Sequence, residues 1–310
     1  MNNKILVTDS LFIFPEHEEM IRKAGYEIER LDKPMATEEE LMEAITGKVG
    51  YILGGIEKVT DKVIAAADDL KVIVFTGSDW KQFIPAHELA TKKGIAIANA
   101  PGANSYAVAE YTMTLMLAMT RNIFELGRTG KSTFQTRPSL KELTVGIIGM
   151  GHIGSEVVRM LKGLSAGKIL NHNRTQKPEI EKETRAMLTD LETLLKTSDI
   201  VTIHIPKSSG QFIGKEHLVL MKDKALIVNC AFPEAIDSEA LLEELKSERL
   251  RAAYDKSINT DFDTLPFGIW FRSNADTAYN THEANLKGSD MGVTSLLNLL
   301  SKGEDQYKVN

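Results

Sequence analysis

The stretch Val145–Gly154 reads Val-Gly-Ile-Ile-Gly-Met-Gly-His-Ile-Gly, and it indicates the fold more clearly than any other segment. An apolar, strand-like run, Thr144–Ile148, ends at a glycine turn. In that turn Gly149, Gly151 and Gly154 have the spacing G-x-G-x-x-G, and apolar residues at helical spacing follow. A strand, a glycine turn and a helix in this order are typical of a dinucleotide-binding motif.

Each glycine of this turn has an expected physical role. Gly149 permits the tight turn, and Gly154 lets the helix and the strand pack closely. Gly151 has no Cβ, so a pyrophosphate can approach the backbone at the positive end of the helix. The sequence therefore favours a bound dinucleotide. The alternative is a glycine-rich turn that holds no ligand.

Composition narrows the class of protein. The 310 residues are 43% hydrophobic, which suffices for one large domain or two ordinary ones. The net charge of −6, with acids and bases mixed, argues against a nucleic-acid-binding surface. The longest apolar stretch, Tyr111–Thr120, is too short to cross a membrane, and the N-terminus shows no signal-peptide pattern. Cys230 is the single cysteine, so a reducing, cytoplasmic location is expected.

Strand-like and helix-like segments alternate along both halves of the chain. In the first half we expect strands at Lys4–Thr8, Val49–Leu53, Val72–Phe75 and Ile95–Ala98. In the second half we expect them at Thr144–Ile148, Lys168–Asn171, Ile200–Ile205, Ala225–Val228, Ala252–Tyr254 and Thr277–Asn280. Such alternation predicts an α/β protein with two Rossmann-like, doubly wound parallel sheets.

Five segments together carry a resemblance to a known family: Gly94–Ser105, Val108–Glu110, Val145–Gly154, Asp199–Pro206 and Ala225–Ala231. They resemble the D-isomer-specific 2-hydroxyacid dehydrogenases, a group that includes phosphoglycerate dehydrogenases and glyoxylate/hydroxypyruvate reductases. The resemblance implies a cofactor domain, residues 101–282, inserted into a flavodoxin-like substrate domain made of residues 1–100 and 283–310. It also implies an active site between the two domains and a homodimer joined through the cofactor domain.

The residues after the second strand of the cofactor domain indicate which cofactor binds. The acid that usually binds the ribose hydroxyls, about 20 residues after the glycines, is absent. Asn173 stands in its place, and Arg174 and Thr175 follow. A guanidinium grips a 2′-phosphate that a carboxylate would repel. NADP is therefore preferred. NAD remains possible if Arg174 instead stacks on the adenine or faces water.

The resemblance implies further cofactor contacts. His152 and Ile153 would present backbone N–H groups to the pyrophosphate. The nicotinamide side would be lined by His204, Pro206, Cys230, Ala231 and Asp255. Asp255 would accept a hydrogen bond from the carboxamide. Purely structural roles remain open for His204 and Asp255.

The reduction of a 2-keto acid needs a cation for the carboxylate, an acid for the proton and a carboxylate that orients the acid. The family uses arginine, histidine and glutamate. His282 matches the histidine, but Phe232 stands where the arginine is expected, and the glutamate is not matched. Asp261 is the expected replacement for the glutamate, with Asp263 as the alternative. Lys256 and Arg272 are possible replacement cations or simply surface charges.

The substrate is expected at the carboxyl ends of strands in the first half, where open α/β sheets place ligands. Gly54, Gly55, Thr76 and Gly77 lie there, and their backbone N–H groups can bind an oxyanion. Phe232 would make the pocket wall apolar. No metal site is expected.

Three functions fit these observations. The first is an NAD(P)-dependent oxidoreductase that acts on a small 2-hydroxy or 2-keto acid, or on a related carbonyl compound. The second is a catalytically inactive NAD(P)-binding regulator or partner protein. The third is a non-redox reaction in the same site. In each case the expected ligand is a small molecule, with no nucleic acid and no membrane involved.

Overall fold

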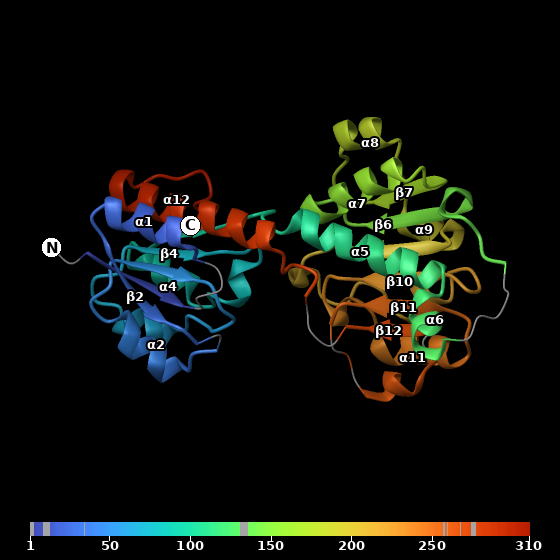
Figure 1. The fold of residues 1–310 in the computed structure, drawn as a ribbon, viewed down its shortest axis with the longest axis horizontal. Coiled ribbons are helices and arrows are strands. Elements are labelled where there is room, and N and C mark those ends of the chain that lie inside the picture. Colours follow the sequence, from blue (N-terminus) through green and yellow to red (C-terminus); the bar gives the residue numbers. More distant parts are fainter. Residues whose placement is uncertain are drawn as a thin grey trace. The chain divides into compact units, whose positions relative to one another are not determined.

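A computed structural model describes residues 3–8, 13–33, 35–130, 136–256, 258, 260–266, 268–273 and 277–310. The chain divides into two compact units, each built on a parallel sheet (Figure 1). Unit 1 combines Met1–Asn104 with Asn280–Asn310, and unit 2 is Ser105–Tyr279. Unit 2 is therefore inserted into the chain of unit 1.

The sheet of unit 1 has the spatial strand order β2-β1-β3-β4-β5, and all its pairs are parallel. Its strands are β1 (Lys4–Thr8), β2 (Glu27–Leu31), β3 (Gly50–Leu53), β4 (Val72–Phe75) and β5 (Ala96–Asn99). Its helices are α1 (Pro15–Lys23), α2 (Glu38–Ile45), α3 (Asp61–Ala66), α4 (His87–Lys92) and α12 (His282–Lys302). This is the flavodoxin-like order, which reverses direction between β1 and β3.

Helices cover both faces of the unit 1 sheet because its central strands are apolar on both sides. Along β1, Ile5 and Val7 face the helices α1 and α12 and share a buried cluster with Leu296 of α12. Leu6, between them, belongs to the opposite cluster, which includes Leu41 of α2. The alternation of side chains along the strand thus supplies two cores.

The sheet of unit 2 has the order β12-β11-β10-β9-β6-β7-β8, again with parallel pairs. Its strands are β6 (Thr144–Ile148), β7 (Lys168–His172), β8 (Met187–Leu188), β9 (Ile200–Ile203), β10 (Leu226–Asn229), β11 (Arg251–Tyr254) and β12 (Trp270–Arg272). Its helices are α5 (Ser105–Thr120), α6 (Ile123–Thr129), α7 (His152–Gly163), α8 (Pro178–Thr184), α9 (Leu191–Thr197), α10 (Lys215–Leu218) and α11 (Ser238–Lys246). The order reverses between β6 and β9, as in the Rossmann fold.

The predicted fold class, two doubly wound α/β domains, is confirmed. The expected strand at Thr277–Asn280 was wrong. The N–H groups of Thr277 and Ala278 donate to the carboxylate of Asp255 instead of to a neighbouring strand.

Helix α5, expected as a long buried segment, is buried along most of its length and packs on α7 and β10. Within the described part of the chain, no helix combines the length and the apolar character needed to cross a bilayer.

Candidate functional site

The glycine turn between β6 and α7 has two crowded positions and an open one. Gly149 has a φ of +91°, and a Cβ there would lie 2.6 Å from the carbonyl oxygen of His204. A Cβ on Gly154 would lie 2.1 Å from the carbonyl oxygen of Gly149. A Cβ on Gly151 would meet no atom within 4 Å. Packing therefore requires glycine at the first and last positions, while the middle one faces open space.

The N-terminus of α7 lies at that open position. Gly151 is its N-cap residue and offers no side chain to the first N–H groups, which include those of His152 and Ile153. The first turn contains no acidic residue that would neutralise the positive end of the helix dipole. An uncapped N-terminus of this kind suits a phosphate group.

The loop after β7 is tied to the glycine turn through Asn173. Its Oδ1 accepts a hydrogen bond from the N–H of Met150 at 3.2 Å, and its Nδ2 donates to the carbonyl of Thr175 at 2.5 Å. Arg174 is exposed and, among the residues that the structure describes, forms no ion pair. Asn173 thus fixes the loop that carries Arg174 beside the turn.

His204 follows β9, across the switch point from the glycine turn. Its ring is buried, and its Nε2 lies 3.0 Å from the hydroxyl of Thr202. Burial lowers the pKa of His204 to about 3, so the ring is neutral near pH 7. Its Nδ1 is buried without a hydrogen-bond partner, which is costly unless a ligand supplies one. Pro206, two residues on, is exposed.

The open space at Gly151, the uncapped α7 and the unpartnered Nδ1 of His204 lie along the carboxyl edge of neighbouring strands β6 and β9. Dinucleotides bind at this edge in doubly wound sheets. The residues present therefore fit a nicotinamide dinucleotide.

The loop after β10 is shaped by Asn229. Its Oδ1 accepts from the N–H of Ala231 at 2.9 Å, and its Nδ2 donates to the carbonyl of Phe232 at 3.0 Å. The ring of Phe232 is buried in the apolar cluster that includes Ile213 and Ile236. The structure gives this ring a packing role in unit 2. Its predicted role as a wall of the substrate pocket stays a prediction.

Asp255 follows β11 and is buried. Its Oδ1 accepts from the N–H of Thr277 at 3.3 Å, and its Oδ2 accepts from the N–H of Ala278 at 2.8 Å. These bonds hold the segment that leads out of unit 2, and a contact with the carboxamide stays a prediction. Cys230, the single cysteine, follows β10 and is buried.

His282 is the first residue of α12. The helix is capped by Thr281, whose hydroxyl accepts from the N–H of Ala284 at 3.2 Å. The imidazole is exposed and meets the ring of Phe14 edge-on, with 5.3 Å between centroids and an angle of 83°. This contact holds one side of the exposed ring.

Phe14 is in turn fixed by a buried histidine. Its N–H donates to Nδ1 of His17 at 3.2 Å, and Nε2 of His17 lies 2.9 Å from Oδ1 of Asp290 in α12. His17 is fully buried. Sequence reasoning missed these residues because the contact joins positions 273 apart, which no local pattern reveals.

The expected substrate loops follow β3 and β4 in unit 1. Thr76 donates its N–H to the carbonyl of Leu53 at 3.3 Å, which joins the loop of Gly77 to the loop of Gly54 and Gly55. The two loops therefore lie side by side at the carboxyl edge of the sheet.

Helix α12 brings His282 to the same edge. A Cβ on Gly288 would lie 2.8 Å from the carbonyl oxygen of Thr76, just beyond β4, and one on Gly292 would lie 3.3 Å from Val74 within the strand. The helix thus runs from the carboxyl edge toward the amino edge. His282, six residues before Gly288, lies about 9 Å further along the helix axis.

The predicted partner of His282, Asp261, belongs to unit 2. It lies in a short 3₁₀ helix (Thr260–Thr264), is exposed, and its carbonyl accepts from the hydroxyl of Thr264 at 3.0 Å. The side chain of Asp263 lies outside the described part of the structure. Arg272 donates to the carbonyl of Ile258 at 2.8 Å. The roles of Asp261, Asp263, Arg272 and Lys256 stay predictions.

Comparison with known proteins gives a consistent picture. The family model described as "D-isomer specific 2-hydroxyacid dehydrogenase, NAD binding domain" matches residues 113–262. A glyoxylate reductase of Thermococcus litoralis is 33% identical over 261 residues, which are 79% of this chain and 77% of that protein. A D-3-phosphoglycerate dehydrogenase of Methanocaldococcus jannaschii is 38% identical over 258 residues, or 81% of this chain.

The chain spans about half the length of that phosphoglycerate dehydrogenase, since the match covers 48% of it. Among solved structures, the TT0316 protein of Thermus thermophilus superposes with a TM-score of 0.85 at 26% identity. That match covers 99% of this chain and 100% of the other.

Proposed function

Since the chain belongs to the D-isomer specific 2-hydroxyacid dehydrogenase family, we propose that it is an NAD(P)-dependent oxidoreductase. It transfers hydride between the nicotinamide and a small 2-hydroxy or 2-keto acid, or a related carbonyl compound. The observation that carries this proposal is the open space at Gly151 beside the uncapped N-terminus of α7. The alternative is a catalytically inactive protein that binds the cofactor, and the activity assay described below distinguishes it from an active enzyme.

The bound dinucleotide supplies the hydride, and unit 2 holds and orients it. The N–H groups of His152 and Ile153 bind the pyrophosphate at the start of α7. His204, kept neutral by burial, offers its unpartnered Nδ1 to a polar group on the nicotinamide side. Pro206, Cys230, Ala231 and Asp255 are the further contacts that family membership supports.

NADP is the preferred cofactor in this proposal, with NAD possible. The exposed guanidinium of Arg174 is available for a 2′-phosphate, because no carboxylate of the described residues pairs with it. Asn173, in the place of the usual acid, uses its side chain to brace the loop. Neither Arg174 nor Asn173 carries a negative charge that would repel the 2′-phosphate of NADP.

The proton donor is His282. Its place at the carboxyl edge of unit 1, beside the loops of Gly54, Gly55, Thr76 and Gly77, supports this role. Backbone N–H groups of these loops bind the carboxylate or the developing alkoxide, in place of the guanidinium that Phe232 does not supply. Asp261 is the proposed orienting carboxylate.

We also propose that the protein is a cytoplasmic homodimer joined through unit 2. The single, buried Cys230 is compatible with a reducing compartment. Family membership supports the dimer, and light scattering of the purified protein measures its molar mass in solution and hence its oligomeric state.

The function is tested by following nicotinamide absorbance with glyoxylate, hydroxypyruvate and other 2-keto acids, with NADPH and NADH in turn. We expect turnover in the wild type and a loss of about 10²–10⁴-fold in His282→Asn, since that range is typical of a positioned general acid. His87→Asn, at the start of α4 in the same unit, is the matched control and should retain full activity. Tight cofactor binding without turnover on the whole panel would instead support the inactive alternative.

A further inference from the structure

The loop after β3 contains a buried carboxyl group, that of Glu57, two residues beyond Gly55. Only 3% of Glu57 is exposed, whereas its chain neighbours Ile56 and Lys58 are exposed. Among the described residues, Asp255 is the other buried acid, and both of its oxygens accept backbone N–H groups. Glu57 is held differently, by two side chains of the sheet.

Two hydroxyl groups bind one oxygen of this carboxyl group. Oε1 of Glu57 accepts from the hydroxyl of Thr8, the last residue of β1, and from the hydroxyl of Tyr51 in β3, the latter at 3.0 Å. Burial, and next the negative charge of Glu57, raise the pKa of Tyr51 well above its usual value, so this phenol stays protonated and remains a donor. Two accepted hydrogen bonds stabilise the ionised form of Glu57.

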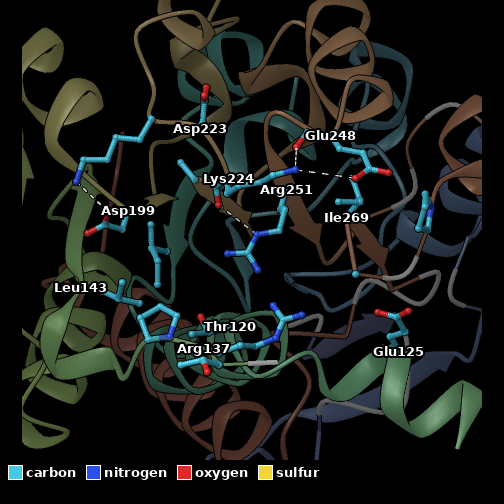
Figure 2. A pocket seen from close by; sticks show the side chains of 17 residues that line it. Thr120, Glu125, Arg137, Leu143, Asp199, Asp223, Lys224, Glu248, Arg251 and Ile269 are labelled. Carbon is cyan, nitrogen blue, oxygen red and sulfur yellow. Dashed lines mark hydrogen bonds and ion pairs between the residues drawn. The ribbon is translucent and has the colours of Figure 1, made fainter. Parts of the chain in front are cut away.

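The other oxygen, Oε2, is buried and has no hydrogen-bond partner. In the part of the chain that the structure describes, no lysine, arginine or histidine forms an ion pair with Glu57. A cavity of unit 2 shows the contrasting arrangement, since Asp199 pairs there with Lys222 at 2.8 Å and Glu248 with Lys224 at 3.9 Å (Figure 2). Glu57 therefore places a negative charge inside unit 1 that no cation offsets, which is costly for the fold.

This charge lies at the edge where the substrate is proposed to bind. Thr8, which binds the carboxylate, is paired with Leu53 in the sheet, and the strand order reverses between β1 and β3. Open α/β sheets bind ligands at such a switch point. Gly55 is two residues from Glu57, so their Cα atoms lie within about 7 Å of each other.

The other charged side chains of the two substrate loops, residues 54–60 and 76–83, are exposed. They are Lys58, Asp79 and Lys81. Water and salt screen exposed charges, while a buried charge is screened much less. Glu57 should therefore dominate the electrostatic potential that a ligand meets at this edge.

Resting on the proposed hydride transfer at this edge, we propose that Glu57 is a specificity-determining residue that selects 2-keto acids with a single negative charge. Backbone N–H groups of the glycine loops offset its repulsion for one carboxylate. A second carboxylate, or a phosphate, on the same small molecule adds repulsion, and Phe232 supplies no guanidinium to offset it. The favoured substrate thus has an uncharged or hydrogen-bond-donating group at the end opposite its keto acid.

The test compares 2-oxoglutarate with 2-oxohexanoate, an acid of similar size whose tail carries no charge. Calorimetry on the full-length protein measures the dissociation constant of each acid in the presence of oxidised NADP, with which a keto acid cannot react. We expect the wild type to prefer 2-oxohexanoate by about tenfold or more, the order expected for one unit charge at this range.

Glu57→Gln keeps an oxygen for the hydroxyls of Thr8 and Tyr51 but removes the charge. It should lower the preference by about tenfold, mainly through tighter binding of 2-oxoglutarate. The matched control is Asp79→Asn, which removes the same charge from an exposed side chain of the neighbouring loop and should leave the preference close to that of the wild type.

The wild type alone decides the question if Glu57→Gln does not fold. A preference set by a buried charge should persist in about 1 M salt, where the Debye length is about 3 Å. A preference that disappears there would assign it to exposed charges and overturn the proposal.

Three further results would overturn the proposal: neither acid binds, 2-oxoglutarate binds the wild type as tightly as 2-oxohexanoate, or Glu57→Gln and Asp79→Asn change the preference equally. The proposed function fails separately. Acid binding with the expected preference but without oxidation of NADPH or NADH would contradict hydride transfer alone, while turnover without any charge preference would contradict only the role of Glu57.

Discussion

At the scale of the residue, Arg174 is the side chain that we propose distinguishes NADP from NAD. We predict that Arg174→Asp weakens NADPH binding by at least tenfold, about 1.4 kcal/mol, because a carboxylate repels the 2′-phosphate. NADH binding should stay the same or improve. Fluorescence titration with each cofactor measures both constants.

Lys177→Asp, an equal change of charge on an exposed residue of the same loop, is the control and should have a smaller effect. Equal losses for NADPH and NADH in Arg174→Asp would contradict the role in phosphate recognition.

His204 should make stability depend on pH. Its folded pKa is about 3, below the ordinary 6.5, so the unfolded chain binds the proton more readily between these values. The contribution of His204 to the free energy of unfolding is therefore complete well above pH 6.5, and it is lost as the pH falls toward 3. Near pH 5.5 the loss is about 1.4 kcal/mol.

Urea unfolding of the wild type and His204→Gln, near pH 7.5 and near pH 5.5, measures this loss. The variant should lose less stability than the wild type between the two conditions. The same loss in both proteins would show that His204 does not titrate in this way.

Two glycines of the turn should respond differently to a methyl group. Gly154→Ala should lower the free energy of unfolding by about 1–3 kcal/mol, the usual cost of overpacking, because the new Cβ would lie 2.1 Å from a backbone oxygen. Gly151→Ala, which meets open space, should leave unfolding nearly unchanged but weaken cofactor binding. Urea unfolding and NADPH titration of both variants check this contrast. A destabilised Gly151→Ala would mean that the space at this position is not open.

At the scale of the element, α1 and α12 jointly support His282 through Phe14. We predict that Phe14→Leu lowers kcat while KM changes little, because the imidazole of His282 loses the edge-on contact that orients it. Phe14→Tyr keeps the ring and should restore activity. Steady-state kinetics of the wild type and of each variant measures kcat and KM separately.

Tyr26→Leu, a change of a partly buried aromatic residue in the same unit, is the control for general destabilisation. Equal losses of kcat in Phe14→Leu and Tyr26→Leu would show that Phe14 does not position His282.

The elements that the sequence predicted well are those set by local pattern. Buried apolar runs indicated β1, β3 and β4, and the glycine spacing indicated the turn before α7. Strand β2 was missed because it is only partly buried and its sequence, Glu-Ile-Glu-Arg-Leu, lacks a continuous apolar run. Strands β8 and β12 are too short for a periodic signal.

Long-range contacts were beyond prediction from sequence alone. The segment after residue 276 looked like a strand, but its N–H groups turn to Asp255. The contact between the buried His17 and the exposed Asp290, behind Phe14, depends on folding distant segments together. The candidate residues themselves were chosen from motifs, and their roles stay predictions.

At the scale of the whole molecule, two parallel-sheet units share the proposed work. Unit 2 carries the glycine turn, Arg174 and His204 for the dinucleotide, while unit 1 carries His282 and the glycine loops for the substrate. Phe232 places a buried ring where the family resemblance implies an arginine, so we propose that substrate recognition relies on other donors. The central claim is that a nicotinamide dinucleotide binds at the start of α7.

The most direct measurement is a titration of the purified, full-length protein with NADPH and NADH, followed by nicotinamide fluorescence. We predict saturable binding of at least one cofactor at micromolar concentration, tighter for NADPH. The absence of binding by both cofactors, even at millimolar concentration, would contradict the account.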